Sequence, residues 1–335
     1  GEREALLRTQ LQAHADEPFD LGEPPLLRAG LWRTGEAEWV LQLVIHHITS
    51  DGWSQGVLNR ELGALYAACL GGTDARLAAL PVQYADYALW QREALSGAGL
   101  SGALDYWKEK LSGLAVLGLP TDRVRPAQPS YRGAVVRFGL DAALTGRLRV
   151  LAREAGGTLY MVLLAAFKVL LSRHSGQSDI AVGTPVAGRG QVELEGLIGF
   201  FVNTLVLRTQ VESGEDFMGV LGRVKETALG AFDHAQMPFE KLVEELRPVR
   251  DPSRNPLFQV MFALQNAPHE ELALSGAEVQ RLGLERAIAK FDLTLELTEA
   301  QTDGGQGLNG VFEYATDLFD AVTVERLVGH YRTLL

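Results

Sequence analysis

The segment His46-His47-Ile48-Thr49-Ser50-Asp51-Gly52-Trp53-Ser54 links an apolar run to a helical pattern. Residues 38–45 before it predict a strand, and residues 26–32 predict a second strand, with a hairpin turn at 33–36. After it, apolar side chains from Val57 to Tyr66 recur at helical spacing. The segment therefore lies where a strand ends and a helix begins, and it brings two histidines, an acid and a glycine to that junction.

Strand and helix patterns alternate along the rest of the chain. Glycines and prolines break the pattern at residues 111–133, which predict the linker between two lobes. We therefore expect an α/β protein with an N-terminal lobe at 1–120 and a C-terminal lobe at 121–335. The other predicted helices are 2–15, 61–70, 84–95, 104–111, 142–154, 159–172, 217–231, 239–246 and 322–335, and the other strands are 134–140, 180–183, 203–211, 257–264, 292–298 and 308–314.

Composition excludes several classes of protein. Of 335 residues, 47% are apolar and 22% charged, so a sizeable core can form and wholesale disorder is excluded. The net charge of −11 argues against nucleic-acid binding, and no run of about eighteen apolar residues predicts a membrane span. The amino terminus lacks the layout of a secretion signal, which predicts a cytoplasmic protein. The abrupt start inside the helical run 2–15 predicts that a preceding piece is missing.

The single cysteine, Cys69, permits neither an internal disulfide nor a cysteine-based metal site. It lies in a helical run, where a small buried hydrophobic residue is the simplest interpretation. We therefore expect Cys69 to be buried.

His46 and His47 are the first candidates for chemistry. Alternation along the strand places them on opposite faces, so we do not expect them to act as a pair. One ring should face a cleft and the other should be held by packing. An imidazole takes up a proton near neutral pH, as a general base must. Two ordinary histidines at a strand end are the structural alternative, and a metal site lacks obvious third and fourth ligands.

The pattern His46-His47-x-x-x-Asp51-Gly52 resembles the signature of condensation domains of nonribosomal peptide synthetases, relatives of chloramphenicol acetyltransferase. Two departures are present: Ala235 and Gln236 replace the Gln and Asp of one family motif, and the two earliest family motifs are absent. The resemblance therefore implies an N-terminally incomplete domain. Four further segments resemble family motifs in order: Tyr84–Trp90, Ile198–Thr204 with Arg208 after it, His234–Glu240, and Arg250–Leu257.

This resemblance implies two lobes like chloramphenicol acetyltransferase that form a V-shaped pseudodimer, with the active site in the cleft between them. The implied activity is amide formation between a donor aminoacyl or peptidyl thioester and the α-amine of an acceptor aminoacyl thioester. Both substrates are held by carrier proteins. The implied partners are donor and acceptor peptidyl carrier domains and a neighbouring adenylation domain. No cofactor or metal is expected to bind directly, since the 4'-phosphopantetheine arm arrives on the carriers. Residues 50–54, followed by 56–58, resemble the subtype that joins two L-residues.

The resemblance also assigns roles to individual residues. His47 would accept a proton from the acceptor amine or orient it, within a catalytic set that includes His46, Asp51 and Gly52. Asp51 would pair with an arginine, either Arg189 or Arg208, in a structural role. Glycine at Gly52 would permit close backbone approach, and its amide is a candidate donor to the oxyanion. The expected substrate-binding residues are Trp53, Ser54 and Asn255.

Three other segments have structural interpretations. Tyr84–Trp90 has aromatic residues at helical spacing, which indicates core packing more than a substrate platform. Residues 250–256 also suit a proline-bounded loop with Asp and Asn turn bonds. By analogy with the family, residues 183–190 lead into a loop that floors the cleft, and residues 265–282 form the latch of the C-terminal lobe.

Related activities fit the sequence less well. Heterocyclising domains replace both histidines with acids. Epimerising domains usually differ in the later motifs, so residues 250–257 argue against them. Acyltransferases that use coenzyme A would not carry all four of the further segments. A different class of function is a condensation-like scaffold that recruits carrier or tailoring proteins without catalysis. The intact His47 and Asp51 argue against that alternative.

Overall fold

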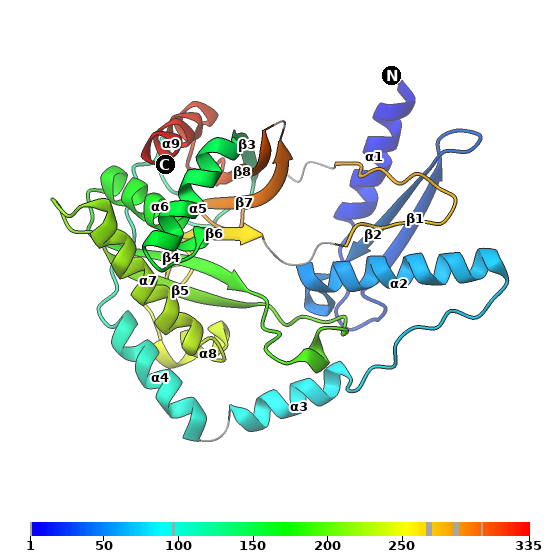
Figure 1. The fold of residues 1–335 in the computed structure, drawn as a ribbon, viewed down its shortest axis with the longest axis horizontal. Coiled ribbons are helices and arrows are strands. Elements are labelled where there is room, and N and C mark those ends of the chain that lie inside the picture. The colour runs from blue at the N-terminus through cyan, green and yellow to red at the C-terminus, as the bar shows by residue number, and fades with distance from the viewer. Residues whose placement is uncertain (1, 96–97, 266–269, 284–287, 303) are drawn as a thin grey trace. The chain divides into compact units, whose positions relative to one another are not determined.

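A computed structural model describes residues 2–95, 98–265, 270–283, 288–302 and 304–335 of the chain. Packing of the backbone divides it into two compact units, whose elements are traced in Figure 1. Unit 1 comprises Gly1–Trp90, Arg189–Val202 and Ala267–Glu285, and unit 2 comprises the remaining three stretches. Residues 91–120 thus pack with unit 2, and two later segments pack with unit 1. The expected lobe ranges, 1–120 and 121–335, stay a prediction.

Unit 1 is built on the predicted hairpin. Strands β1 and β2 are antiparallel, with Leu31 opposite Leu41, and the Gly35 amide donates to the carbonyl of Glu38 in the turn. Helix α1 packs on β2, where the Gln42 side chain donates to the Leu11 carbonyl at 3.0 Å. The elements of unit 1 are α1 (Glu2–Asp16), β1 (Leu27–Arg33), β2 (Trp39–Ile45), the 3-10 turn His47–Thr49, α2 (Gly52–Gly71), α3 (Tyr84–Ala94, continuing past the unit boundary) and the 3-10 turn Val192–Leu194.

Unit 2 contains a six-stranded mixed sheet in the order β3-β8-β7-β6-β4-β5. Strand β6 is parallel to both of its neighbours, and the other pairs are antiparallel. The strands are β3 (Gly133–Leu140), β4 (Asp179–Val186), β5 (Asn203–Gln210), β6 (Val260–Gln265), β7 (Leu293–Thr302) and β8 (Gly305–Ala315). The helices are α4 (Ala98–Leu111), α5 (Ala142–Glu154), α6 (Leu159–Ser175), α7 (Phe217–Asp233), α8 (Phe239–Leu246) and α9 (Ala321–Leu334).

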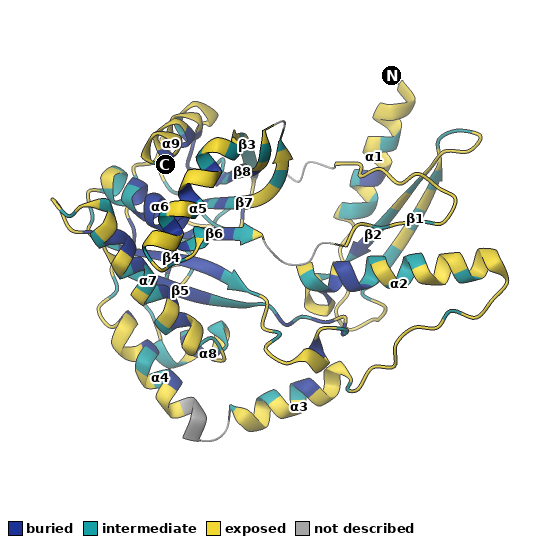
Figure 2. Ribbon diagram, viewed as in Figure 1, coloured by how far each residue is buried: buried dark blue, intermediate teal, exposed yellow. Residues whose placement is uncertain are grey.

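Helix α6 forms the centre of the main core. The Thr158 hydroxyl caps its start by accepting from the Met161 amide, and Gly176 ends it in the left-handed region at φ 70°. Nearly every residue between Met161 and Leu171 is buried, and Figure 2 shows buried residues gathered on α6 and on strands β4 and β5. The apolar run in the sequence therefore becomes a helix that is covered all round.

The predicted elements are present in the predicted order, with small differences at their ends. Strand β6 starts at Val260 and not at the predicted 257, because Leu257 has φ 67° and cannot continue an extended strand. The prediction that Cys69 is buried is wrong: the residue is exposed. The same end of α2 also exposes Leu65 and Leu70.

Within the described residues, no single helix is both long enough and apolar enough to cross a membrane. The bent pair α5 and α6 meets those criteria only jointly, with an angle of 101° at its break.

Candidate functional site

His47 begins a 3-10 turn at the end of β2, and its side chain is held at one nitrogen. Its Nδ1 lies 2.6 Å from the backbone carbonyl oxygen of Ser50. A carbonyl can only accept a hydrogen bond, so Nδ1 carries the proton and Nε2 of the neutral ring has a free lone pair. His47 is exposed, and Nε2 has no hydrogen bond to the described part of the chain. The geometry therefore gives His47 the tautomer of a proton acceptor at Nε2.

His46 has the opposite arrangement. Its Nδ1 accepts a hydrogen bond of 3.1 Å from the Ile48 amide and so caps the turn that begins at His47. Its ring contacts Phe19 at a centroid distance of 6.0 Å, whereas the His47 ring contacts Phe200 at 5.2 Å. The two rings have separate neighbours, as strand alternation predicts.

Asp51 caps helix α2 and is buried. Its Oδ1 accepts from the Ser54 amide at 2.9 Å and from the Ser54 hydroxyl at 2.7 Å, and its Oδ2 accepts from the Phe201 amide at 3.0 Å. Burial opposes ionisation, but these hydrogen bonds and the charge of Arg189 outweigh it and lower the pKa of Asp51. Asp51 is therefore a fixed carboxylate and not a proton carrier near neutral pH.

Arg189, and not Arg208, is the partner of Asp51. Its Nη2 lies 3.2 Å from Asp51 Oδ1, and its side chain is fully buried. Its Nη1 donates to the carbonyls of Leu194 and Leu197, and its guanidinium carbon lies 4.0 Å from the centre of the Phe201 ring. Arg208 lies in unit 2, where it pairs with Asp179 at 2.7 Å. The sequence left Arg189 and Arg208 as alternatives, and the structure pairs Asp51 with Arg189.

Ser54 joins these groups. Its hydroxyl oxygen lies 2.8 Å from Arg189 Nη2 and accepts from the Gly199 amide at 3.1 Å, in addition to its contact with Asp51. The Gly199 carbonyl lies 2.9 Å from the same oxygen. The side chain is fully buried and all of its bonding capacity has protein partners. We expected Ser54 to contact substrate; the geometry corrects this and makes it a structural centre.

Trp53 and Gly52 occupy the first turn of α2. The Trp53 indole N–H donates to the Glu195 carbonyl at 2.9 Å, and its ring is half-buried. Gly52 is exposed, and a Cβ built on it would meet no described atom within 4 Å. Packing among the described residues therefore gives no reason for glycine at this position.

The segment Arg189–Val202 has a small core of its own with α3. Tyr87 is buried there with Leu194, Leu197 and Phe201. Tyr84 contacts Phe201 at 5.1 Å, whereas Trp90 is half exposed. The prediction that Tyr84–Trp90 packs in a core is confirmed for Tyr87 and wrong for Trp90.

The segment 270–283 packs on α2. The Asn59 side chain donates to the Glu270 carbonyl at 2.9 Å, and Arg60 pairs with the Glu270 carboxylate at 3.1 Å. A Cβ on Gly63 would lie 2.6 Å from the Ala273 carbonyl oxygen, so only glycine permits this close approach. The first part of the predicted latch, residues 266–269, lies outside the described residues.

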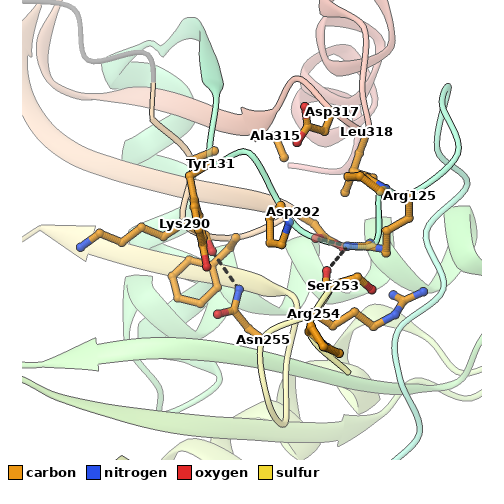
Figure 3. Close-up of a pocket in the computed structure, with 15 residues that line it drawn as sticks. Arg125, Tyr131, Ser253, Arg254, Asn255, Lys290, Asp292, Ala315, Asp317 and Leu318 are labelled. Carbon is orange, nitrogen blue, oxygen red and sulfur yellow. Dashed lines mark hydrogen bonds and ion pairs between the residues drawn. The ribbon is translucent and has the colours of Figure 1, made fainter. Parts of the chain in front are cut away.

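Asn255 belongs to unit 2, so it is described apart from the histidine segment. Its amide donates to the Lys290 carbonyl at 2.8 Å and lines a small pocket (Figure 3). Arg125 also lines that pocket, where it pairs with the buried Asp292 and donates to the Ser253 carbonyl at 3.1 Å. The predicted turn bonding of the 250–256 loop is also present, because Asp251 accepts from both the amide and hydroxyl of Ser253.

Sequence reasoning missed several of these contacts. Arg125 lies in the proline-rich linker and gave no signal, since its partner Asp292 is 167 residues away. Phe200 was noted only as part of a motif. Among the described residues, no group of three or more His, Cys, Asp and Glu side chains is placed to hold a metal ion.

Comparison with known proteins agrees with the fold. A family model described as "Condensation domain" matches residues 1–335. One of the proteins that make up linear gramicidin synthase in Brevibacillus parabrevis is 50% identical over 100% of this chain and 4% of its own length. The X-domain from teicoplanin biosynthesis, also solved in complex with OxyB, is 32% identical with a TM-score of 0.90, covering 98% of this chain and 75% of that one. A four-domain nonribosomal peptide synthetase bound to AMP and glycine is 27% identical with a TM-score of 0.81, covering 98% and 26%.

The chain belongs to the condensation-domain family, the class of domain found in nonribosomal peptide synthetases. Its mixed α/β architecture is that of the solved condensation domains. It spans only 4% of the length of the gramicidin synthase protein that it matches.

Proposed function

We propose that this chain forms an amide bond between a donor aminoacyl or peptidyl thioester and the α-amine of an acceptor aminoacyl thioester. His47 is the proposed proton acceptor. The observation that carries this proposal is the hydrogen bond from Nδ1 to the Ser50 carbonyl, which leaves Nε2 of an exposed imidazole free to accept a proton. Membership of the condensation-domain family supports the same reaction.

The proposed step balances without a cofactor. The acceptor nitrogen attacks the donor carbonyl carbon, a C–N bond forms, and the C–S bond breaks. The proton lost from nitrogen passes to Nε2 of His47 and then to the leaving thiolate. The products are an amide and a free thiol. The phosphopantetheine arm is written here as part of each substrate, because it belongs to the carrier that brings the thioester.

Base catalysis is only part of the proposed acceleration. A thioester is already an activated acyl donor and a free amine is a good nucleophile. Holding both in line supplies effective molarities of about 10⁵ M or more, whereas a positioned base adds about 10²–10⁴-fold. We therefore expect loss of His47 to slow the reaction strongly while leaving a residual rate.

The other residues of the signature have supporting roles in this proposal. His46, Asp51 and Ser54 position the His47 turn and the start of α2 through the contacts described above. The Gly52 amide, at the N-terminus of α2, is our candidate donor to the oxyanion of the tetrahedral intermediate. Trp53 and Asn255 are kept as proposed substrate contacts.

The substrate form, the subtype, the neighbouring domain and the location are proposed from the resemblance to the condensation-domain family. We propose that the domain acts on carrier-bound substrates, joins two L-residues, and works beside an adenylation domain in the cytoplasm. Relatives such as linear gramicidin synthase support a role in the synthesis of a peptide natural product.

A second candidate is a scaffold that recruits a carrier or tailoring protein without catalysis. The likeness to the teicoplanin X-domain, which was solved in complex with OxyB, favours it. The exposed His47 with its free Nε2 favours the catalytic proposal instead.

The test uses the full-length protein with loaded donor and acceptor carrier domains, and amide product is measured by mass spectrometry. We expect product from the wild type and a rate about 10²–10⁴-fold lower for His47→Ala. His330→Ala removes an exposed imidazole from α9 in unit 2 and serves as the matched control. Equal rates for His47→Ala and wild type would overturn the role of His47. Carrier binding without product in the wild type would favour the scaffold.

A further inference from the structure

The His47 ring has a second contact besides Ser50. The ring of Phe200 meets it at a centroid distance of 5.2 Å and an interplanar angle of 81°. This edge-to-face arrangement is the one that aromatic rings prefer. A single hydrogen bond to the Ser50 carbonyl holds Nδ1 but still tolerates some rotation of the imidazole about its Cβ–Cγ bond. A ring packed against the imidazole restricts that rotation.

The Phe200 backbone is anchored on both sides. The Gly199 amide donates to the Ser54 hydroxyl at 3.1 Å, and the Phe201 amide donates to Asp51 at 3.0 Å. At Phe200 itself, the carbonyl accepts from the Tyr84 hydroxyl at 2.8 Å. Three consecutive residues are thus tied to α2, its N-cap Asp51 and α3, so the backbone from which the Phe200 ring extends is held in place.

The Tyr84 hydroxyl is suited to donate the hydrogen bond that holds the Phe200 carbonyl. Burial and the nearby charge of Asp51 raise the pKa of the Tyr84 hydroxyl, so it stays protonated and keeps donating. A Cβ on Gly199 would lie 2.3 Å from the Tyr84 ring, so the loop seats directly against that ring only because residue 199 is glycine.

We propose that Phe200 is a positioning residue that aims Nε2 of His47, and that Tyr84 acts on His47 through Phe200. The inference rests on the proposed function of His47 and adds two residues to it. Phe200 touches no reacting atom in this scheme. It limits the orientations of the imidazole, and Tyr84 fixes the peptide group from which the Phe200 ring extends.

The test compares Phe200→Leu with Phe200→Tyr in the full-length protein. Leucine keeps apolar volume but loses the ring face and edge, whereas tyrosine keeps both. We expect kcat of amide formation to fall about tenfold to a hundredfold in Phe200→Leu with KM little changed, since misplacing a catalytic group by about 1 Å can cost about 10²-fold. Phe200→Tyr should keep most of the wild-type kcat, because it keeps the aromatic ring. Phe232→Leu on α7 replaces a half-exposed phenylalanine in unit 2 and is the activity control.

A spectroscopic readout separates positioning from general damage. With labelled histidine, the ring-proton NMR resonances of His47 should shift in Phe200→Leu, because the ring current of Phe200 is lost. Phe19→Leu should shift the His46 resonances instead, since Phe19 contacts that ring. Tyr84→Phe removes one hydroxyl group and should give a smaller His47 shift and a smaller loss of kcat.

Wild-type kcat and an unshifted His47 resonance in Phe200→Leu would overturn the inference. If Phe200→Leu does not fold, Tyr84→Phe decides by the same two measurements. These outcomes can be told apart from a failure of the proposed function. Wild-type activity in His47→Ala would remove the catalytic role of His47. The resonance shift in Phe200→Leu reports the contact between Phe200 and His47 whether or not His47 is catalytic.

Discussion

The Arg189 guanidinium and the Asp51 carboxylate form an ion pair of 3.2 Å in which the arginine side chain is fully buried. The pair joins the loop 189–202 to the start of α2, over a separation of 138 residues in the chain. Both groups have further hydrogen-bond partners, which is the condition under which buried charges are tolerated. The acid of the signature therefore acts on structure, and it fixes the helix start that follows His47.

The first prediction concerns this ion pair. Asp51→Asn removes the charge but keeps the shape, so Arg189 becomes an uncompensated buried cation. We expect unit 1 to lose about 3–5 kcal/mol of its free energy of unfolding, the usual cost of breaking a buried pair from one side. Chemical denaturation measures the loss. Glu244→Gln, which breaks an exposed pair with Lys241, should cost less than about 0.5 kcal/mol. If Asp51→Asn lowered the free energy of unfolding as little as Glu244→Gln does, the structural role of Asp51 would be contradicted.

The second prediction concerns the buried lysine of α6. Lys168 Nζ is fully buried and donates to the Ile180 carbonyl at 3.1 Å and to the Thr209 hydroxyl at 3.0 Å. Burial lowers the pKa of Lys168 to about 7, although the Asp179 charge opposes this. Between pH 7 and the ordinary lysine pKa of 10.5, the unfolded chain therefore binds a proton that the folded chain does not. The stability of unit 2 should rise with pH across that window.

Lys168→Met tests this dependence. The variant should lose the rise in stability, which is at most about 1.4 kcal/mol per pH unit for one group. Thermal unfolding at several pH values between 7 and 9.5 measures the slope. Lys241→Met removes an exposed lysine and should keep the wild-type slope. The same slope in Lys168→Met as in wild type would show that Lys168 is charged in the folded chain throughout the window.

The third prediction concerns the contact of segment 270–283 with α2. Gly63→Ala places a methyl group where the Ala273 carbonyl oxygen lies 2.6 Å away, so the segment must move off the helix. We expect faster amide hydrogen exchange in residues 270–283. Gly222→Ala on α7 meets no described atom within 4 Å and should stabilise that helix by about 0.5–1 kcal/mol. Unchanged exchange in Gly63→Ala would contradict the close packing at Gly63.

Local pattern was sufficient to predict most of the fold. The alternation of residues 38–45 predicted β2 and the separate surroundings of His46 and His47, because strand parity depends on nearest neighbours alone. The long apolar run 159–172 predicted α6. The end of β6 nearest Leu257 was placed wrongly, since a leucine with positive φ has no sequence signal.

Long-range pairing explains most of what the sequence could not predict. Arg189 and Arg208 look alike in sequence, and only the folded chain shows that one meets Asp51 and the other Asp179. Ser54 lies two residues after the signature, and the family resemblance implied a substrate contact there, but Gly199 and Arg189 fill its bonding capacity from 145 and 135 residues away. Cys69 was predicted to be buried from local composition, which does not report which face of α2 is covered.

The proposed role of His47 requires that its neutral ring carries the proton on Nδ1 and presents an unprotonated Nε2. Nitrogen-15 NMR of the imidazole, in the full-length protein at a pH where the ring is neutral, measures the tautomer directly. We predict a protonated Nδ1 and an unprotonated Nε2 for His47, and the reverse for His46. A His47 ring protonated on Nε2 would contradict the account, because that nitrogen would have no lone pair to take a proton from the amine.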